Sequence, residues 1–121
     1  MNPKRAYVYN SAMSEVRLVY VTTGDQTEAD RIANALVMER LAACANILGS
    51  IKSVYVWQGK LEAGSEVAML VKTTQPHVAA VIDRIKALHS YQCPAIVVLP
   101  VLGGNAEFLQ WVEAEVQLQP G

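Results

Sequence analysis

The chain has 121 residues, of which 52% are hydrophobic and 17% are charged, and its formal net charge is −1. That length fits one domain, and the apolar content excludes intrinsic disorder of the body of the chain. The near-neutral charge argues against nucleic acid as the principal partner, and the longest apolar run, residues 95–102, is too short to span a membrane.

Residues 1–15 precede the first strong structural signal. They contain Lys4 and Arg5 without a following apolar stretch, which is not the pattern of a secretory signal. We expect them to form a flexible N-terminal leader, and we expect the folded domain to span residues 16–121. Cys44 and Cys93 are too few for a disulfide framework, so we expect reduced thiols and a cytoplasmic location.

The first predicted strand covers residues 16–23, which are rich in β-branched and aromatic side chains. Asp25 followed by Glu28 forms a capping-box pattern, with Thr27 as a rival cap, and predicts a helix that reaches about Leu41.

A long hairpin is predicted next. Residues 46–57 form its first strand, interrupted at Gly49, and residues 60–74 form its second, with a turn at Gln58 and Gly59. Within the second strand, residues 67–71 are all apolar, so we expect both faces to be covered there.

Pro76 occupies the place of a first-turn proline and opens a second predicted helix with an apolar stripe up to Leu88. Residues 95–102 form a fourth predicted strand, which Gly103 and Gly104 interrupt. Asn105 can cap a last helix.

The element order β-α-β-β-α-β-α predicts an α+β protein with a ferredoxin-like βαββαβ fold and an extra C-terminal helix. Its middle hairpin is long enough to overrun its own domain. Exposed strand edges and a charge-poor surface both favour assembly, so we expect an oligomer.

His89 and Cys93 favour metal chemistry, because imidazole and thiolate together suit copper or zinc. Pro94 and the predicted helix end keep them off a common helix face. A strong site would need further ligands from a carboxylate, a neighbouring chain or solvent. The alternative for His89 is an imidazole favoured by the helix dipole, and Cys44 is typical of a small buried hydrophobe.

Trp57 and Lys72 flank the predicted hairpin. We expect Trp57 to pack at an interface, although it could stack on a ligand. Lys72 could hold an anionic group or remain a solvated strand-end charge. No nucleophile, base and orienting group occur together, so the sequence does not predict an enzyme.

Five stretches carry a resemblance to a known family: LAACANI (41–47), SVYVWQGKLE (53–62), EVAMLVKTT (66–74), YQCP (91–94) and FLQWV (108–112). In this order they resemble the CutA divalent-cation-tolerance family, over roughly residues 16–116. The resemblance implies a tight homotrimer with the architecture of the PII signalling proteins. It also implies copper binding and tolerance of divalent cations, at a site between subunits around residues 89–95, with contributions from Trp57 and Lys72.

The site region departs from the family pattern His-Pro-Tyr-Glu-x-Pro-Glu. Ser90 replaces the first Pro, and Gln92 and Ala95 replace the two Glu. The missing carboxylates weaken the expectation of hard-cation binding, and Cys93 shifts it towards soft ions such as Cu(I).

Three functions are therefore open. The first is a trimer that binds copper or another divalent or soft metal ion through His89 and Cys93, with Tyr91 shaping the site. The second is a PII-like signalling trimer for a small anionic metabolite, with Lys72, Trp57 and Tyr91 lining the cleft. The third is a stable scaffold without a small ligand.

Overall fold

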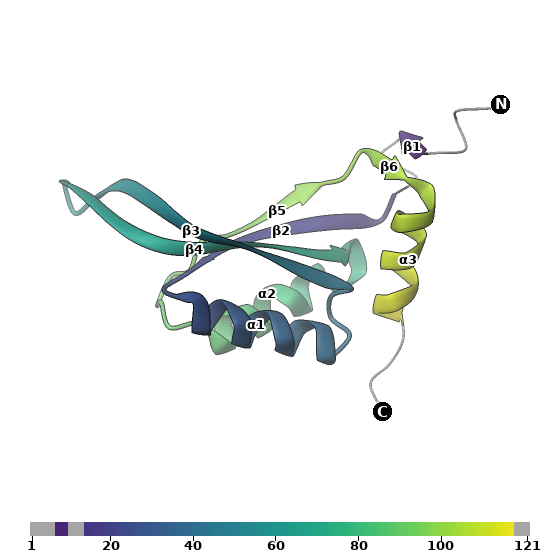
Figure 1. Cartoon of the computed structure of the whole chain (residues 1–121), viewed down its shortest axis with the longest axis horizontal. Helices are drawn as coiled ribbons and strands as arrows, with labels where there is room; N and C mark the ends of the chain where they lie inside the picture. The colour runs from purple at the N-terminus through teal and green to yellow at the C-terminus, as the bar shows by residue number, and fades with distance from the viewer. Residues whose placement is uncertain (1–6, 10–13, 118–121) are drawn as a thin grey trace.

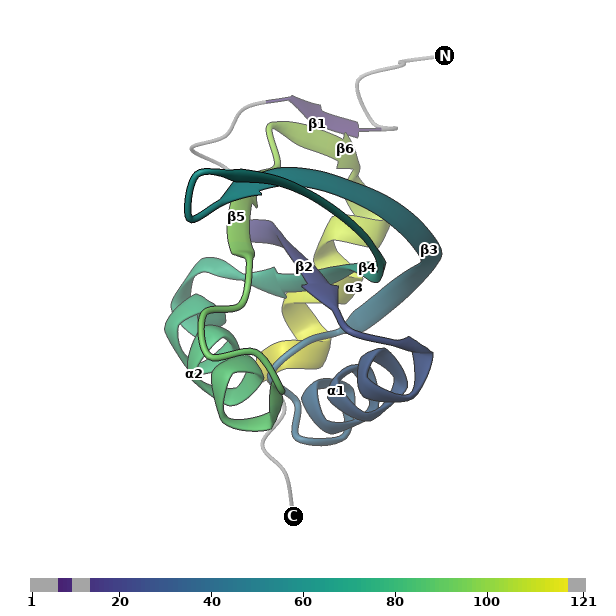
Figure 2. The same ribbon diagram turned by 90° about the vertical axis from the view of Figure 1, so that its left-hand side faces the viewer.

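The computed structural model describes residues 7–9 and 14–117. Its centre is a four-stranded antiparallel sheet (Figure 1). Its strand order is β3 (Cys44–Trp57), β4 (Lys60–Thr74), β2 (Val16–Thr23) and β5 (Ile96–Pro100). The helices α1 (Gln26–Met38) and α2 (Val78–Leu88) lie against one face, and α3 (Ala106–Gln117) packs at the end of the sheet (Figures 1 and 2). A short 3₁₀ helix, η2 (Gln75–His77), precedes α2. The predicted α+β class, βαββαβ order, extra helix and long hairpin are confirmed.

The core lies between the sheet and the helices α1 and α2. Alternate residues of the strands point into it because side chains of a strand alternate between faces. Its largest fully buried side chains include Ile32, Leu36, Val19, Val21, Met69, Val71, Val81 and Ile85. The apolar run 67–71 is buried as expected except for Leu70, which is half-buried.

Helix α1 begins as predicted at Asp25, whose carboxylate accepts a hydrogen bond from the Glu28 amide at 2.8 Å. Thr27 is not the cap. The helix ends at Met38 rather than near Leu41, and the prediction was wrong there. Arg40 turns the chain in a left-handed conformation, with φ 62°. Glycine usually occupies this position after a helix, and the sequence has none here.

The hairpin β3–β4 extends well beyond the rest of the sheet, because β2 pairs with β4 only as far as Val67. Beyond that point, residues 51–57 pair only with residues 60–66, over roughly 20 Å at the usual strand rise. The expected interruption of β3 is a register shift between Ile47 and Gly49, where φ is 104°. A bare two-stranded ribbon is at best marginally stable in water, so this one requires cover.

The turn at the end of this ribbon has φ 51° at Gln58 and φ 80° at Gly59, as a two-residue type I′ turn requires. We predict that Gly59→Ala lowers the free energy of unfolding by about 1 kcal/mol, since a side chain disfavours this backbone region. Gly64→Ala is the matched control. A Cβ at either position would meet nothing within 4 Å, and only Gly59 has a positive φ. Equal urea midpoints for the two variants would contradict the assignment.

The N-terminal region contributes one strand that the sequence did not predict. Strand β1 (Tyr7–Tyr9) pairs antiparallel with β6 (Gly103–Asn105). Gly103 and Gly104 therefore lie beyond the end of β5, as predicted, but also belong to a short strand of their own. Residues 1–6 and 10–13 lie outside the described residues, and the expectation of a flexible leader there stays a prediction. Asn105 accepts a hydrogen bond from the Glu107 amide, in keeping with its predicted capping role.

Candidate functional site

His89 lies at the C-terminal end of α2, and its side chain is fully buried. Its Nδ1 accepts a hydrogen bond from the Tyr91 amide at 3.0 Å, and its Nε2 lies 2.8 Å from the Thr22 carbonyl oxygen. Because the Tyr91 amide is a donor, Nδ1 carries the lone pair and Nε2–H donates to Thr22. Both nitrogens of the neutral imidazole are therefore engaged within one protomer.

The buried carboxylate of Glu28 lies next to His89. Glu28 is 5% exposed, and its two oxygens accept hydrogen bonds from the Gly24 amide at 2.8 Å and the Ser90 amide at 2.6 Å. Burial by itself would raise the pKa of Glu28, but these hydrogen bonds outweigh it and lower the pKa from its usual value. One oxygen also lies 3.9 Å from Nδ1 of His89. Glu28 is therefore a charged group that ties the start of α1 to the loop after α2.

Tyr91 lies on the other side of the loop. Its hydroxyl donates a 3.1 Å hydrogen bond to Glu66 of β4, which also accepts a hydrogen bond from Ser53 of β3. Burial, the hydrogen bond to Glu66 and the negative charges of Glu66 and Glu28 together raise the pKa of Tyr91 to about 12. Burial is the largest cause of this shift, and the two carboxylates add to it.

We predict that Glu66→Gln moves the pKa of Tyr91 down from about 12 towards 10.0, because the phenol loses its charged acceptor. The contribution of the pair to stability is complete below the ordinary tyrosine pKa and is lost as the pH rises through about 12. Phenolate absorbance, with Tyr91→Phe subtracted, isolates this residue from the other tyrosines. An unchanged titration of Tyr91 in the Glu66 variant would contradict the assignment.

Cys93 is exposed, and Cys44 is half-buried rather than fully buried as expected. Both thiols are free. Among residues 7–9 and 14–117, no three His, Cys, Asp or Glu side chains of one protomer converge on a possible metal position. His89 and Cys93 thus share a loop but do not form a complete metal site within a single chain.

Trp57 and Lys72 lie far apart in the protomer. Trp57 is 60% exposed and pairs with Lys60 at the tip of the hairpin, whereas Lys72 pairs with Cys44 at the other end. Lys72 lies twelve residue steps along β4 from Lys60, which is roughly 40 Å. The Nζ of Lys72 lies 5.2 Å from the ring centroid of Phe108. A site that contains both Trp57 and Lys72 therefore requires two copies of the chain.

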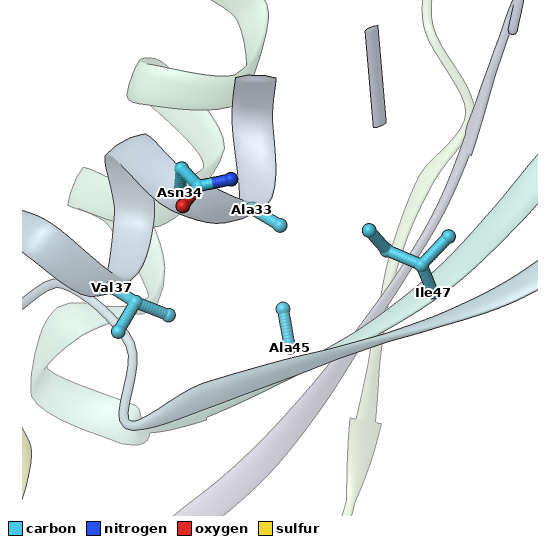
Figure 3. Close-up of a pocket in the computed structure, with 5 residues that line it drawn as sticks. All are labelled: Ala33, Asn34, Val37, Ala45 and Ile47. Carbon is cyan, nitrogen blue, oxygen red and sulfur yellow. The ribbon is translucent and has the colours of Figure 1, made fainter. Parts of the chain in front are cut away.

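A separate open groove of about 290 Å³ lies between α1 and the start of β3 (Figure 3). Its lining is apolar except for one amide: Ala33, Asn34, Val37, Ala45 and Ile47. It contains no thiol, imidazole or carboxylate, so it does not suit a metal ion.

Comparison with known proteins decides the family. The profile described as CutA1 divalent ion tolerance protein matches residues 17–115. The chain belongs to this family. The "Divalent-cation tolerance protein CutA" of Archaeoglobus fulgidus is 46% identical over 99 residues, which are 82% of this chain and 96% of the relative. The Pectobacterium atrosepticum protein of the same name is 41% identical over 100 residues, covering 83% and 91%.

Solved CutA1 structures agree with the fold. The CutA1 of Ehrlichia chaffeensis aligns with a TM-score of 0.82 and 39% identity over 88% of this chain and 99% of that one. The CutA of Archaeoglobus fulgidus, which is described as periplasmic, aligns with a TM-score of 0.81 and 44% identity. The alignment covers 84% of this chain and 98% of that one. A rice relative, 38% identical over 79% of this chain and 54% of its own length, is named chloroplastic. The expected cytoplasmic location of this chain therefore stays a prediction. Within the described residues, no helix combines the length and apolar character needed to cross a bilayer.

Proposed function

We propose that this chain is a homotrimeric divalent-cation tolerance protein that binds copper, or another divalent or soft cation, in a cleft between subunits. The observation that carries the proposal is the loop after α2. It presents the exposed Cys93 thiol close in sequence to His89, whose Nδ1 lies 3.9 Å from the Glu28 carboxylate. Family membership supports tolerance of divalent ions as the physiological role.

The projecting ribbon supports assembly. Its exposed apolar side chains are Val54, Tyr55, Val56, Trp57 and Leu61, and the sheet face away from α1 and α2 adds Val97 and Leu99. Many large apolar side chains exposed on one ribbon and on a neighbouring sheet face are typical of a protein interface. The trimer, rather than another oligomer, comes from the family resemblance.

The donor set fits a soft cation only in part within one protomer. Cys93 offers a free thiol, while His89 would have to exchange its hydrogen bond from the Tyr91 amide for a metal ion at Nδ1. Thiolate and imidazole are the ligands that copper prefers. The remaining ligands would come from a neighbouring subunit or solvent, and Tyr91, Trp57 and Lys72 would line the cleft.

The alternative function, binding of a small anionic metabolite, finds less support. The charged groups that act on Tyr91 are the carboxylates of Glu66 and Glu28, and Lys72 lies roughly 20 Å along β4 from Glu66. An anion would need the Lys72 of another subunit. A thermal-shift screen with nucleotides and small anions tests this alternative, since a ligand of the native state raises its apparent stability.

The experiment for the main proposal is a Cu(I) titration under reducing conditions with a competing chelator. We expect His89→Ala and Cys93→Ser each to weaken binding at least about tenfold, whereas Cys44→Ser, the matched control for the second thiol, leaves it unchanged. A Cu(I) affinity that is unchanged in both His89→Ala and Cys93→Ser would overturn the assignment of these ligands.

A further inference from the structure

The loop after α2 has no acidic residue of its own between Leu88 and Ile96. The charged side chains that hydrogen-bond to its backbone come from α1. Glu28 of α1 accepts the Ser90 amide at 2.6 Å, and Arg31 of the same helix donates to the Leu88 carbonyl oxygen at 2.9 Å. Two side chains from the first turns of α1 thus hydrogen-bond to the backbone at the start of the loop.

Two further contacts tie the same loop to the corner between β2 and α1. His89 donates to the Thr22 carbonyl oxygen, and the Tyr91 ring lies so close to Gly24 that a Cβ there would be 3.6 Å from it. Glu28 connects these contacts because its other oxygen accepts the Gly24 amide. One carboxylate therefore fixes both the corner and the loop.

We propose that Glu28 is a positioning residue for cation binding: it holds His89, Ser90 and Tyr91 in the conformation from which the loop binds its ligand, without touching that ligand. This inference rests on the proposed function. Glu28 acts through the Ser90 amide of the loop and the Gly24 amide of the corner, both of which donate to its carboxylate. Removing a group that orients a metal ligand typically weakens metal affinity about 10- to 100-fold.

The two exposed polar contacts of this region cannot replace it, and the bond from the buried His89 to Thr22 provides no acceptor for the Ser90 amide. The Arg31 side chain is 53% exposed, so water competes for its bond to Leu88. The hydrogen bond from Tyr91 to Glu66 is also exposed and fixes the tip of a side chain rather than the backbone. Glu28 is the buried anchor, and its removal leaves the Ser90 amide without its acceptor.

The test compares Glu28→Gln with Asp30→Asn in the full chain. Both variants neutralise one carboxylate of α1, but Asp30 is exposed and makes no contact with the loop among the hydrogen bonds of the described residues. In Glu28→Gln we expect Ser90 and Tyr91 amide exchange and Cu(I) dissociation constants to rise at least about tenfold. We expect the strand amides of β2 and β4 to keep their protection. Asp30→Asn should match the wild type in every respect.

Several outcomes would overturn the inference. Unchanged exchange at Ser90 would show that Glu28 does not hold the loop. Faster exchange throughout the sheet would show a general structural role, and faster loop exchange with unchanged Cu(I) affinity would show that loop position does not matter for binding. Failure of the wild type to bind Cu(I) would instead overturn the proposed function, and the Ser90 exchange rate would still decide whether Glu28 holds the loop.

Discussion

Replacing Val56 and Leu61 together by aspartate is expected to convert the proposed trimer into a monomer. The two residues are direct cross-strand partners on the projecting ribbon, with 68% and 75% of their surface exposed in the single chain. In the proposed assembly this surface is buried, and an unpaired carboxylate in an apolar interface is strongly unfavourable. Sedimentation equilibrium or light scattering measures the change directly.

Lys86→Glu is the control for net charge. It alters the charge by the same two units as the double variant, but at an exposed position of α2 away from the ribbon. We expect it to remain a trimer. Circular dichroism checks that the double variant keeps its sheet and helices, and a folded double variant that stays trimeric would contradict the role given to the ribbon.

Glu28→Ala is expected to lower the free energy of unfolding by about 2–4 kcal/mol, because two backbone amides lose their acceptor at a buried position. Asp30→Ala, two residues along the same helix and exposed, should cost far less. Urea unfolding at a fixed protein concentration compares the variants, since assembly links stability to concentration. Equal midpoints for the two would contradict the account of Glu28.

The pH dependence of this effect has a definite sign. The pKa of Glu28 is lowered in the folded protein, so its contribution to stability is present above the ordinary glutamate pKa and is lost as the pH falls through the folded value. The difference between wild type and Glu28→Ala should therefore shrink at acid pH. A difference that grows on acidification would mean that the carboxylate is not held in its charged form.

Much of the fold could be predicted from local pattern. Strands Val16–Thr23 and Lys60–Thr74 have their predicted bounds, because Gly24 ends the first, and Gly59 and Pro76 flank the second. The end of α1 was missed because Arg40 takes a left-handed conformation that usually belongs to glycine. Strand β6 was missed because its two glycines indicate a break, and only the distant β1 makes them a strand.

The candidate site was predicted only in part. His89 and Tyr91 were predicted as site residues from the sequence, and that role stays a prediction. Their carboxylate partners Glu28 and Glu66 are 61 and 25 residues away from them in the chain. No local spacing reveals such contacts. The capping-box pattern did single out Glu28, but it predicted a return bond to the cap residue, whereas the carboxylate accepts the Gly24 and Ser90 amides.

The central claim is that the cation site is completed between subunits, and the most direct test is Cu(I) affinity as a function of assembly. The wild type and the folded Val56→Asp, Leu61→Asp variant are titrated side by side against the same chelator, with Lys86→Glu as the control. We expect the variant, as a monomer, to bind at least about tenfold more weakly, because the described residues of one chain bring no three possible ligands together. A monomer that binds Cu(I) as tightly as the trimer would contradict a site shared between subunits.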